Sequence, residues 1–241
     1  PNTVYSTLSG NLSTRLHEVK FTNNSKGAHT VTNSERKLFE DAHAFDNMTD
    51  KQIKILAAAI DVFAEKGYAN TSTKEIAEKA GVAEGNIFNK FVNKRGLLHA
   101  IVTPVMQSFF PASMDTFVKT QLTKVYPSLN AFITALVQDR FAFLKQNSKV
   151  IKIFVSEMLY DQEVRAQLTT EFTGAYWHRI NQQLDSLKAN HLIVDWSNIE
   201  ILKTMWSITG GAILGYLYFD QQLTKTSTDH AITALVKALS Y

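Results

Sequence analysis

Apolar residues recur at intervals of three and four along most of the chain, which is the period of amphipathic helices. The first clear stretch lies between Thr49 and Gly67, where Thr49 and Gln52 fit a capping box and Gly67 suits a left-handed C-terminal stop. Its apolar face holds Ile53, Leu56, Ala57, Ile60, Phe63 and Ala64. Strand-like alternation of useful length and internal repeats are both missing, so the pattern predicts an all-α fold.

Two short helices are predicted next, joined by a tight turn at Gly81. The first begins at Ser72, whose hydroxyl can cap the amide of Glu75 while the Glu75 carboxylate reaches back. The second covers residues 83–91 and is anchored by the apolar side chain of Ile87. Two helices joined in this way can lay the second one in the major groove of DNA, although two packed helices of an ordinary bundle would show the same period.

The rest of the chain keeps the helical period, and helices are expected at residues 95–110, 128–146, 148–160, 162–189, 197–219 and 228–239. Three prolines punctuate the first part of this region. Pro104 should kink or divide its helix, because proline lacks the amide that the helix needs. Pro111 and Pro127 should mark helix boundaries.

The first 48 residues show no sustained period and are rich in Ser, Thr and Asn. We therefore expect a poorly ordered extension, with a short helical piece around residues 35–45 left open. Met48 is the first methionine, which leaves open whether residues 1–47 belong to the native protein. The sequence assigns no function to this extension.

Lysine and arginine number 25 and aspartate and glutamate 22, so the formal net charge of +3 does not by itself indicate a nucleic-acid-binding protein. The chain has no cysteine, which excludes disulfides, a cysteine nucleophile and thiolate metal sites. The longest apolar stretch, residues 204–219, is shorter than a membrane-spanning helix, so we expect a cytoplasmic protein without a membrane partner. The histidines lack ligand spacing, and a phosphate loop and a nucleophile elbow are absent, so no metal, cofactor or enzymatic site is expected.

The residues around the two short helices carry a more specific signal. Residues 71–91 read TSTKEIAEKAGVAEGNIFNKF and residues 93–98 read NKRGLL. This run closely resembles the signature of TetR-family transcription regulators, in which a threonine pair opens the second helix and a lysine opens the fourth. In that signature Ile-Ala and Ala-Gly-Val define the turn, and a glycine and an aromatic pair mark the recognition helix. Residues 57–68 also look like the first helix of the family, so the resemblance extends from residue 57 to residue 98.

The resemblance implies a DNA-binding face made of Ser72, Thr73, Gly85, Asn86, Phe88, Asn89, Lys90 and Lys94. Ser72 and Lys94 would hold phosphates, because helix N-termini and ammonium groups both attract them. Asn86, Asn89 and Lys90 would face the groove, where asparagine can pair with adenine and lysine can reach guanine or a phosphate.

Three residues depart from the family pattern. Ala83 stands where the family usually has a serine that caps the recognition helix, and Phe88 replaces a tyrosine whose hydroxyl reaches a phosphate. Arg95 replaces a common acidic residue and could restore one phosphate contact. Glu84 could accept a hydrogen bond from a cytosine amine, although the helix dipole alone also favours a carboxylate there.

The resemblance also implies an effector pocket and a dimer interface in the C-terminal part. The side chains suited to a hydrophobic effector are Phe110, Met114, Phe141, Met158, Tyr176 and Trp206. Each of them alone is also compatible with ordinary core packing. Gly211 and Gly215 lie on a small-residue face of the penultimate helix, where the family dimerises, although packing within one protomer would use the same face.

The sequence therefore predicts a homodimeric repressor that a small hydrophobic effector releases from a palindromic, double-stranded DNA operator. We expect an extension at residues 1–48, a helix-turn-helix DNA-binding domain at 49–98, and a helical effector-binding and dimerisation domain at 99–241. Two alternatives stay open, namely a helical ligand-binding or architectural DNA-binding protein without operator specificity, and an all-α enzyme. A preference for an operator over a random duplex would exclude the architectural alternative.

Overall fold

In the computed structural model, the described residues are 39–41, 43–162, 164–166 and 176–241. Every regular element in these ranges is helical, which confirms the all-α prediction. The α-helices that we use below are α2 (Asp50–Lys66), α3 (Thr73–Ala80), α4 (Gly85–Phe91), α5 (Lys94–Pro104), α6 (Phe110–Phe117), α7 (Leu129–Gln146), α8 (Ser148–Tyr160), α10 (Trp177–Ala189), α11 (Asn198–Tyr218) and α12 (Lys225–Leu239). Two π-helical segments are η1 (Val105–Phe109) and η2 (Val118–Leu122). Within the described part of the chain, no helix is long and apolar enough to cross a membrane.

Cap residues end α2 and α3 largely where the sequence predicts. The Thr49 hydroxyl oxygen accepts from the Gln52 amide at 3.4 Å and Gln52 Oε1 accepts from the Thr49 amide at 2.9 Å, which confirms the capping box. Gly81, with φ +68°, ends α3 in the left-handed region. Gly67 also has a positive φ of +78°, but its ψ of 157° lies outside the left-handed helical region, so this stop differs from the predicted one.

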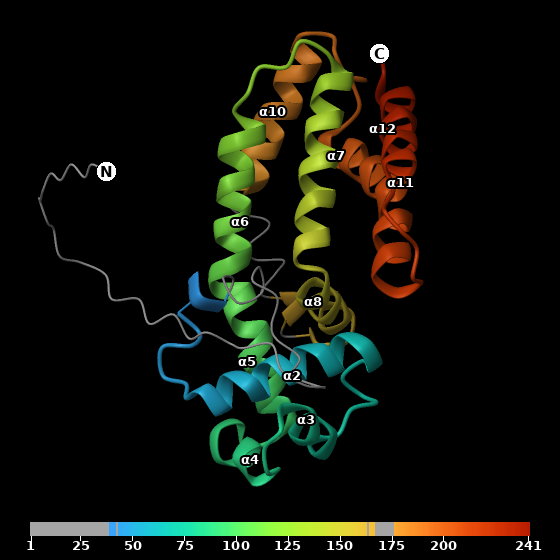
Figure 1. Cartoon of the computed structure of the whole chain (residues 1–241). Coiled ribbons are helices and arrows are strands. Elements are labelled where there is room, and N and C mark those ends of the chain that lie inside the picture. Colours follow the sequence, from blue (N-terminus) through green and yellow to red (C-terminus); the bar gives the residue numbers. More distant parts are fainter. Residues whose placement is uncertain (1–38, 42, 163, 167–175) are drawn as a thin grey trace, which may run out of the picture.

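α5 and α6 follow each other along one bent rod, drawn in green in Figure 1. Pro104 ends α5, and the next turn is π-helical, with the Phe110 amide donating to the Val105 carbonyl. The helix is therefore divided at Pro104 as predicted, because proline cannot donate the usual bond. Pro111 does not end the helix, since it lies in the first turn of α6 where a missing amide costs little, and the chain stays helical to Leu122.

The upper half of Figure 1 is a bundle in which α6, α7 and α10 stand upright and α12 lies against α7 with α11 beside it. Its most deeply buried side chains are Ile133, Leu184, Ile193, Ile201, Leu235 and Leu239. The helices predicted at 128–146, 148–160 and 197–219 agree with α7, α8 and α11 to within a residue. α12 begins earlier than predicted, because Thr224 caps it, and part of the helix predicted at 162–189 lies outside the described residues.

A second core joins α2 to α5, α8 and a residue upstream of α2. Phe39 is fully buried in it, and its ring stacks on that of Phe45 with 5.6 Å between the centroids. α8 contributes Val150, Ile153 and Phe154 to the same core. This core thus includes Phe39, which precedes residue 48, and Ile101 and Val102, which follow residue 98. Residues 1–38 of the predicted extension lie outside the described residues.

Candidate nucleic-acid interface

α3 and α4 form a helix-turn-helix at the lower end of the molecule in Figure 1. Ser72 caps α3, because its Oγ accepts from the Glu75 amide at 3.1 Å. The Glu75 carboxylate does not form the predicted reciprocal bond to Ser72. Glu75 instead accepts from the Lys66 ammonium, and this hydrogen bond raises the pKa of Lys66. α3 is in this way fixed to the end of α2.

The apolar side of α4 sets its orientation. Ile87 and Phe91 are buried where α4 packs against α2 and α5. Phe88, Asn89 and Lys90 are exposed on the remaining surface, with 47% of Phe88 accessible to solvent. α4 therefore offers exposed side chains to a partner over residues 88–90, which suits a helix that reads the major groove.

Two polar side chains of α4 are held by backbone carbonyls in the free protein. Asn86 Nδ2 donates to the Ala83 carbonyl at 3.0 Å, and Lys90 Nζ donates to the Asn47 carbonyl at 3.2 Å. A contact with DNA requires each group to exchange or share that bond. A Cβ at Gly85 would meet nothing within 4 Å, so the packing of the protein itself does not require a glycine there.

Thr73 and Glu84 tie α3 to α4. Thr73 Oγ1 donates to Glu84 Oε1 at 2.5 Å, and Glu84 makes no side-chain cap on α4. The carboxylate is therefore engaged within the motif, which disfavours its use on a cytosine amine. Ala83 has no hydroxyl to cap α4, so the bond between Thr73 and Glu84 is what fixes the first turn of that helix to α3.

Lys94 is engaged within the protein. Its ammonium donates to the Tyr68 carbonyl at 2.8 Å and the Thr71 carbonyl at 2.7 Å, and it lies 4.4 Å from the centroid of the Tyr68 ring. These contacts fasten the start of α5 to the loop that leads into Ser72. A phosphate would have to compete with two carbonyls for the same ammonium, so the geometry gives Lys94 a positioning role and leaves its phosphate contact a prediction.

Asn93 and Gly96 fix the turn after α4, a role that the sequence reasoning missed. Asn93 Oδ1 accepts from the Gly96 amide at 2.8 Å and caps α5. A Cβ at Gly96 would lie 1.9 Å from the Phe91 carbonyl oxygen, so this position requires glycine. The signal for the cap was present, because asparagine is among the preferred N-cap residues. The close approach at Gly96 depends on the path of the backbone and has no local signal.

Arg95 points to the end of α8. One guanidinium nitrogen lies 3.5 Å from Asp161 Oδ2, and Nε lies within hydrogen-bond distance of His99 Nε2 at 3.3 Å. Burial beside the Asp161 charge raises the pKa of Glu157, while His99 and Arg95 act in the opposite direction. The phosphate contact expected of Arg95 is therefore disfavoured by this pairing with α8.

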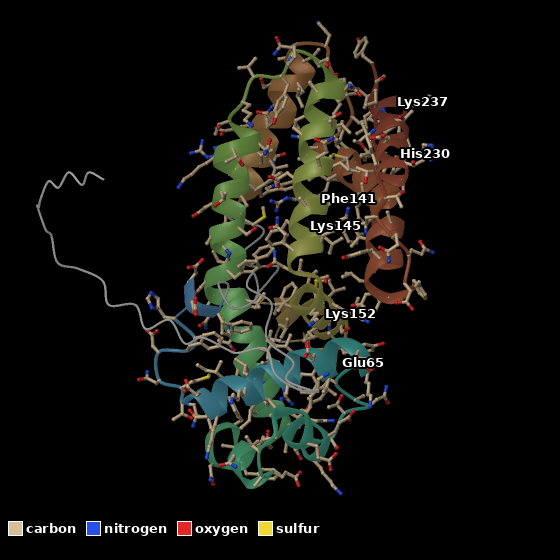
Figure 2. The ribbon with its side chains drawn as sticks, in the orientation of Figure 1. Glu65, Phe141, Lys145, Lys152, His230 and Lys237 are labelled. Atoms are coloured by element: carbon tan, nitrogen blue, oxygen red, sulfur yellow. The ribbon has the colours of Figure 1, made fainter. Side chains whose placement is uncertain are left out.

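A second charged cluster joins the same module to the start of α8. Asp61 on α2 lies 2.5 Å from the Lys149 ammonium of α8 and 3.7 Å from the Lys79 ammonium of α3. Its side chain is only 9% exposed, so these pairs are partly shielded from water. They border a cleft of about 410 Å³ between α2, α3, α8 and the end of α11, and Figure 2 labels two of its wall residues, Glu65 and Lys152.

Four of the six predicted effector residues lie together in or beside the bundle core. Met114 and Phe141 are buried in that core, and Phe110 and Tyr176 pack against it. The Phe110 ring stacks on that of Phe154 with 6.4 Å between centroids, and the Tyr176 hydroxyl donates to a carbonyl of α6 at 3.1 Å. Figure 2 labels Phe141 on α7 inside the bundle.

Met158 and Trp206 are not among the side chains of the bundle core or those packed against it. Met158 is half-buried on α8, and Trp206 is 59% exposed on α11. The Trp206 side chain thus faces outward in the single protomer, and its contact with an effector stays a prediction. Two cavities in the described part of the chain, of about 410 and 260 Å³, are lined by side chains other than the six predicted ones.

The two glycines predicted at a dimer interface have different surroundings. Gly211 is exposed, and a Cβ there would meet nothing within 4 Å. Gly215 is buried, and a Cβ there would lie 2.2 Å from Gln221 Oε1 of the same chain. Only Gly211 is open to a partner, while Gly215 packs within the protomer.

Comparisons with known proteins agree with the helix-turn-helix geometry. Residues 55–101 match the model of the family described as bacterial regulatory proteins, tetR family. The uncharacterized HTH-type transcriptional regulator YvkB of Bacillus subtilis is 27% identical over 191 residues, which cover 78% of this chain and 96% of that protein. The fatty acid metabolism regulator protein of Bacillus subtilis is 36% identical over 73 residues, 30% of this chain and 37% of that protein.

Solved structures share the fold over most of the described chain. The MbdR regulator from Azoarcus sp. CIB superposes with a TM-score of 0.60 at 14% identity and covers 79% of this chain and 100% of that one. The fatty acid degradation regulator FadR from Bacillus halodurans has a TM-score of 0.56 at 20% identity and covers 79% of this chain and 96% of that one. The solved structures show a shared fold, while the matched helix-turn-helix motif and the relatives named as HTH-type transcriptional regulators identify the chain as a regulator of the TetR family.

Proposed function

We propose that the protein is a homodimeric repressor that binds a palindromic DNA operator with α4 and leaves it when a small hydrophobic effector binds the bundle. The observation that carries this proposal is the polarity of α4, which buries Ile87 and Phe91 and leaves Asn89 and Lys90 exposed beside Asn86. Amide and ammonium groups are those that read adenine and guanine edges. Its activity is binding without catalysis, and it works in the cytoplasm beside the bacterial chromosome.

The predicted DNA-binding residues take different roles in this proposal. Asn86, Asn89 and Lys90 read base edges, and the exposed Phe88 ring suits an apolar contact with a thymine methyl group. Ser72 uses its hydroxyl oxygen on the Glu75 amide and keeps the hydroxyl hydrogen for a phosphate. Thr73 supports α4 through its bond to Glu84, and Lys94 supports it through the loop carbonyls. Gly85 leaves open space at the first turn of α4, so the DNA backbone can come close there.

Dimerisation through α11 and α12 would bring two copies of α4 to successive half-sites, about 34–36 Å apart along the duplex. The exposed surface of α11 supports this role, because it carries Ile199, Trp206 and Leu214, and because the space at Gly211 is open. Exposed apolar side chains gathered on one helix mark a surface for a partner. The functional division that we propose therefore places DNA binding in residues 39–98 and effector binding and dimerisation in residues 99–241.

The effector site is proposed within the bundle, around Phe110, Met114, Phe141, Met158 and Tyr176. Flexible methionines beside flat aromatic rings suit an apolar ligand. The names of some of the similar proteins refer to fatty acid metabolism or degradation, so fatty acids are the first compounds to test. Release of the protein from DNA by one of these compounds would support an effector site of this kind.

The experiment that tests the proposal begins with a duplex that the protein itself selects from a random-sequence pool. Asn86→Ala is expected to lower affinity for the selected duplex by about 1–3 kcal/mol, and for a random duplex by less. Asn190→Ala is the matched control, because Asn190 also donates to a nearby carbonyl, that of Ser186, but lies at the end of α10. Selection without an enriched sequence would contradict the proposal and favour architectural binding.

A further inference from the structure

The C-terminal end of α4 lies beside the start of α2. Lys90 on α4 donates to the carbonyl of Asn47, which lies two residues before the capping residue Thr49. Figure 1 shows α2 beginning on the side of the module where α4 lies and ending on the opposite side. A duplex seated on α4 therefore passes close to the first turns of α2.

Two lysines stand on those first turns. Lys51 and Lys54 are both exposed and three residues apart, so they project from one face of α2. Among the carboxylates that the structure describes, none lies within ion-pair distance of either ammonium. Of the two nearby acids, Asp46 pairs with His43 at 3.0 Å and Asp50 lies in the first turn of α2.

The capping box at the start of α2 already uses the amides of Thr49 and Gln52. The groups that we assign to anion binding are the two lysine side chains, whose charges sit on long flexible stems. Such charges suit the phosphates of a duplex, which form a regular row along the edge of the groove that α4 would enter.

We propose that Lys51 and Lys54 bind phosphates of the same duplex that α4 reads, so that the DNA-contacting surface runs from α4 across Asn47 to the first turns of α2. This proposal rests on the proposed function of α4. Contacts of this kind position the protein on DNA and add affinity, but they do not discriminate between sequences. The pair adds two phosphate contacts for each protomer on the duplex.

The test compares the full-length Lys51→Gln/Lys54→Gln variant with wild type on the selected duplex and on a random duplex over a range of salt concentrations. Affinity is expected to fall about tenfold on both duplexes near 0.1 M salt, because two counterion-releasing contacts are lost. The slope of log affinity against log salt should decrease by about two for each bound protomer. Lys51→Arg/Lys54→Arg should keep wild-type affinity.

The matched control is Lys119→Gln/Lys145→Gln, which removes the same charge from exposed positions on η2 and α7; Lys145 is labelled in Figure 2. An equal salt slope for the control and the Lys51/Lys54 variant would overturn the proposal. The result is distinguishable from a failure of the proposed function, because Asn86→Ala changes sequence preference and the lysine pair does not. If wild type shows no preference for any sequence, the pair can still be tested on the random duplex.

Discussion

The DNA-reading module and the C-terminal bundle are both helical, but their helices are stabilised differently. α3 and α4 have 8 and 7 residues, whereas α7 and α11 have 18 and 21. Helices as short as the first pair are marginal in isolation, so their ends need caps and ties. Longer helices gain most of their stability from one buried face. Capping residues are visible in a sequence, while the partner of a buried face is not.

The largest expected effect is that of Phe39→Ala, outside the recognisable motif. Because Phe39 is fully buried in the module core, its truncation should lower the free energy of unfolding by about 3–5 kcal/mol. Urea denaturation at fixed protein concentration measures this change. Phe88→Ala is the matched control, since its ring is half-exposed, and it should cost less than about 1 kcal/mol. An unchanged urea midpoint for Phe39→Ala would mean that the module begins at α2.

Local signals predicted the fold of the module well. The capping box at Thr49, the cap at Ser72 and the end of α3 at Gly81 depend on neighbouring residues alone, and all three are confirmed, whereas the left-handed stop predicted at Gly67 is not formed. Phe39 was missed because a single aromatic residue in a polar segment has no period. Its role depends on where α5 and α8 place their apolar faces, which no local pattern records.

Candidate site residues were predicted less completely than helices. The motif singled out α4, whose apolar side is buried and whose Asn89 and Lys90 are exposed, and the DNA contacts of these residues stay a prediction. It did not show that Lys94 is held by two carbonyls, or that Arg95 faces Asp161 on α8, because both contacts join residues far apart in sequence. In the bundle, the period predicted α11 but could not tell that Trp206 points outward.

Gly96→Ala should have the next largest effect, because the added Cβ would lie 1.9 Å from a backbone oxygen that cannot move alone. We expect a loss of about 1–3 kcal/mol in the free energy of unfolding. Gly211→Ala provides the contrast from the bundle, since open space in a helix interior should make it neutral or stabilising by up to about 1 kcal/mol. Equal losses for both would remove the distinction between a required and a tolerated glycine.

Asp61→Asn probes the junction between the two regions. Loss of the carboxylate leaves Lys149 and Lys79 without this shared partner, and we expect a cost of about 1–2 kcal/mol, less than for a fully buried pair because Lys149 is 38% exposed. Asp229→Asn is the control, since Asp229 pairs with Lys225 on the exposed side of α12, and it should cost less than about 0.5 kcal/mol. Thermal unfolding at about 0.1 and 0.5 M salt measures both, and a cost at Asp61 that disappears in high salt would place the pair among ordinary surface pairs.

Val92→Gly should have the smallest effect and the opposite sign. Val92 follows α4 with φ +67° and ψ −46°, a conformation that a β-branched residue rarely adopts, and the Asn93 amide donates across it to the Phe91 carbonyl at 2.7 Å. The side chain is 73% exposed, so little packing is lost when it is removed. Relief of the backbone strain outweighs the greater freedom that glycine gives the unfolded chain, and we expect a gain of less than about 1 kcal/mol. Chemical denaturation should compare this variant with Val125→Gly, since Val125 lies in an exposed loop of the bundle with φ below zero. The comparison separates the relief of backbone strain from the greater freedom of the unfolded chain. Val125→Gly should lose stability, and a loss of the same size at Val92 would show that the turn after α4 is not strained.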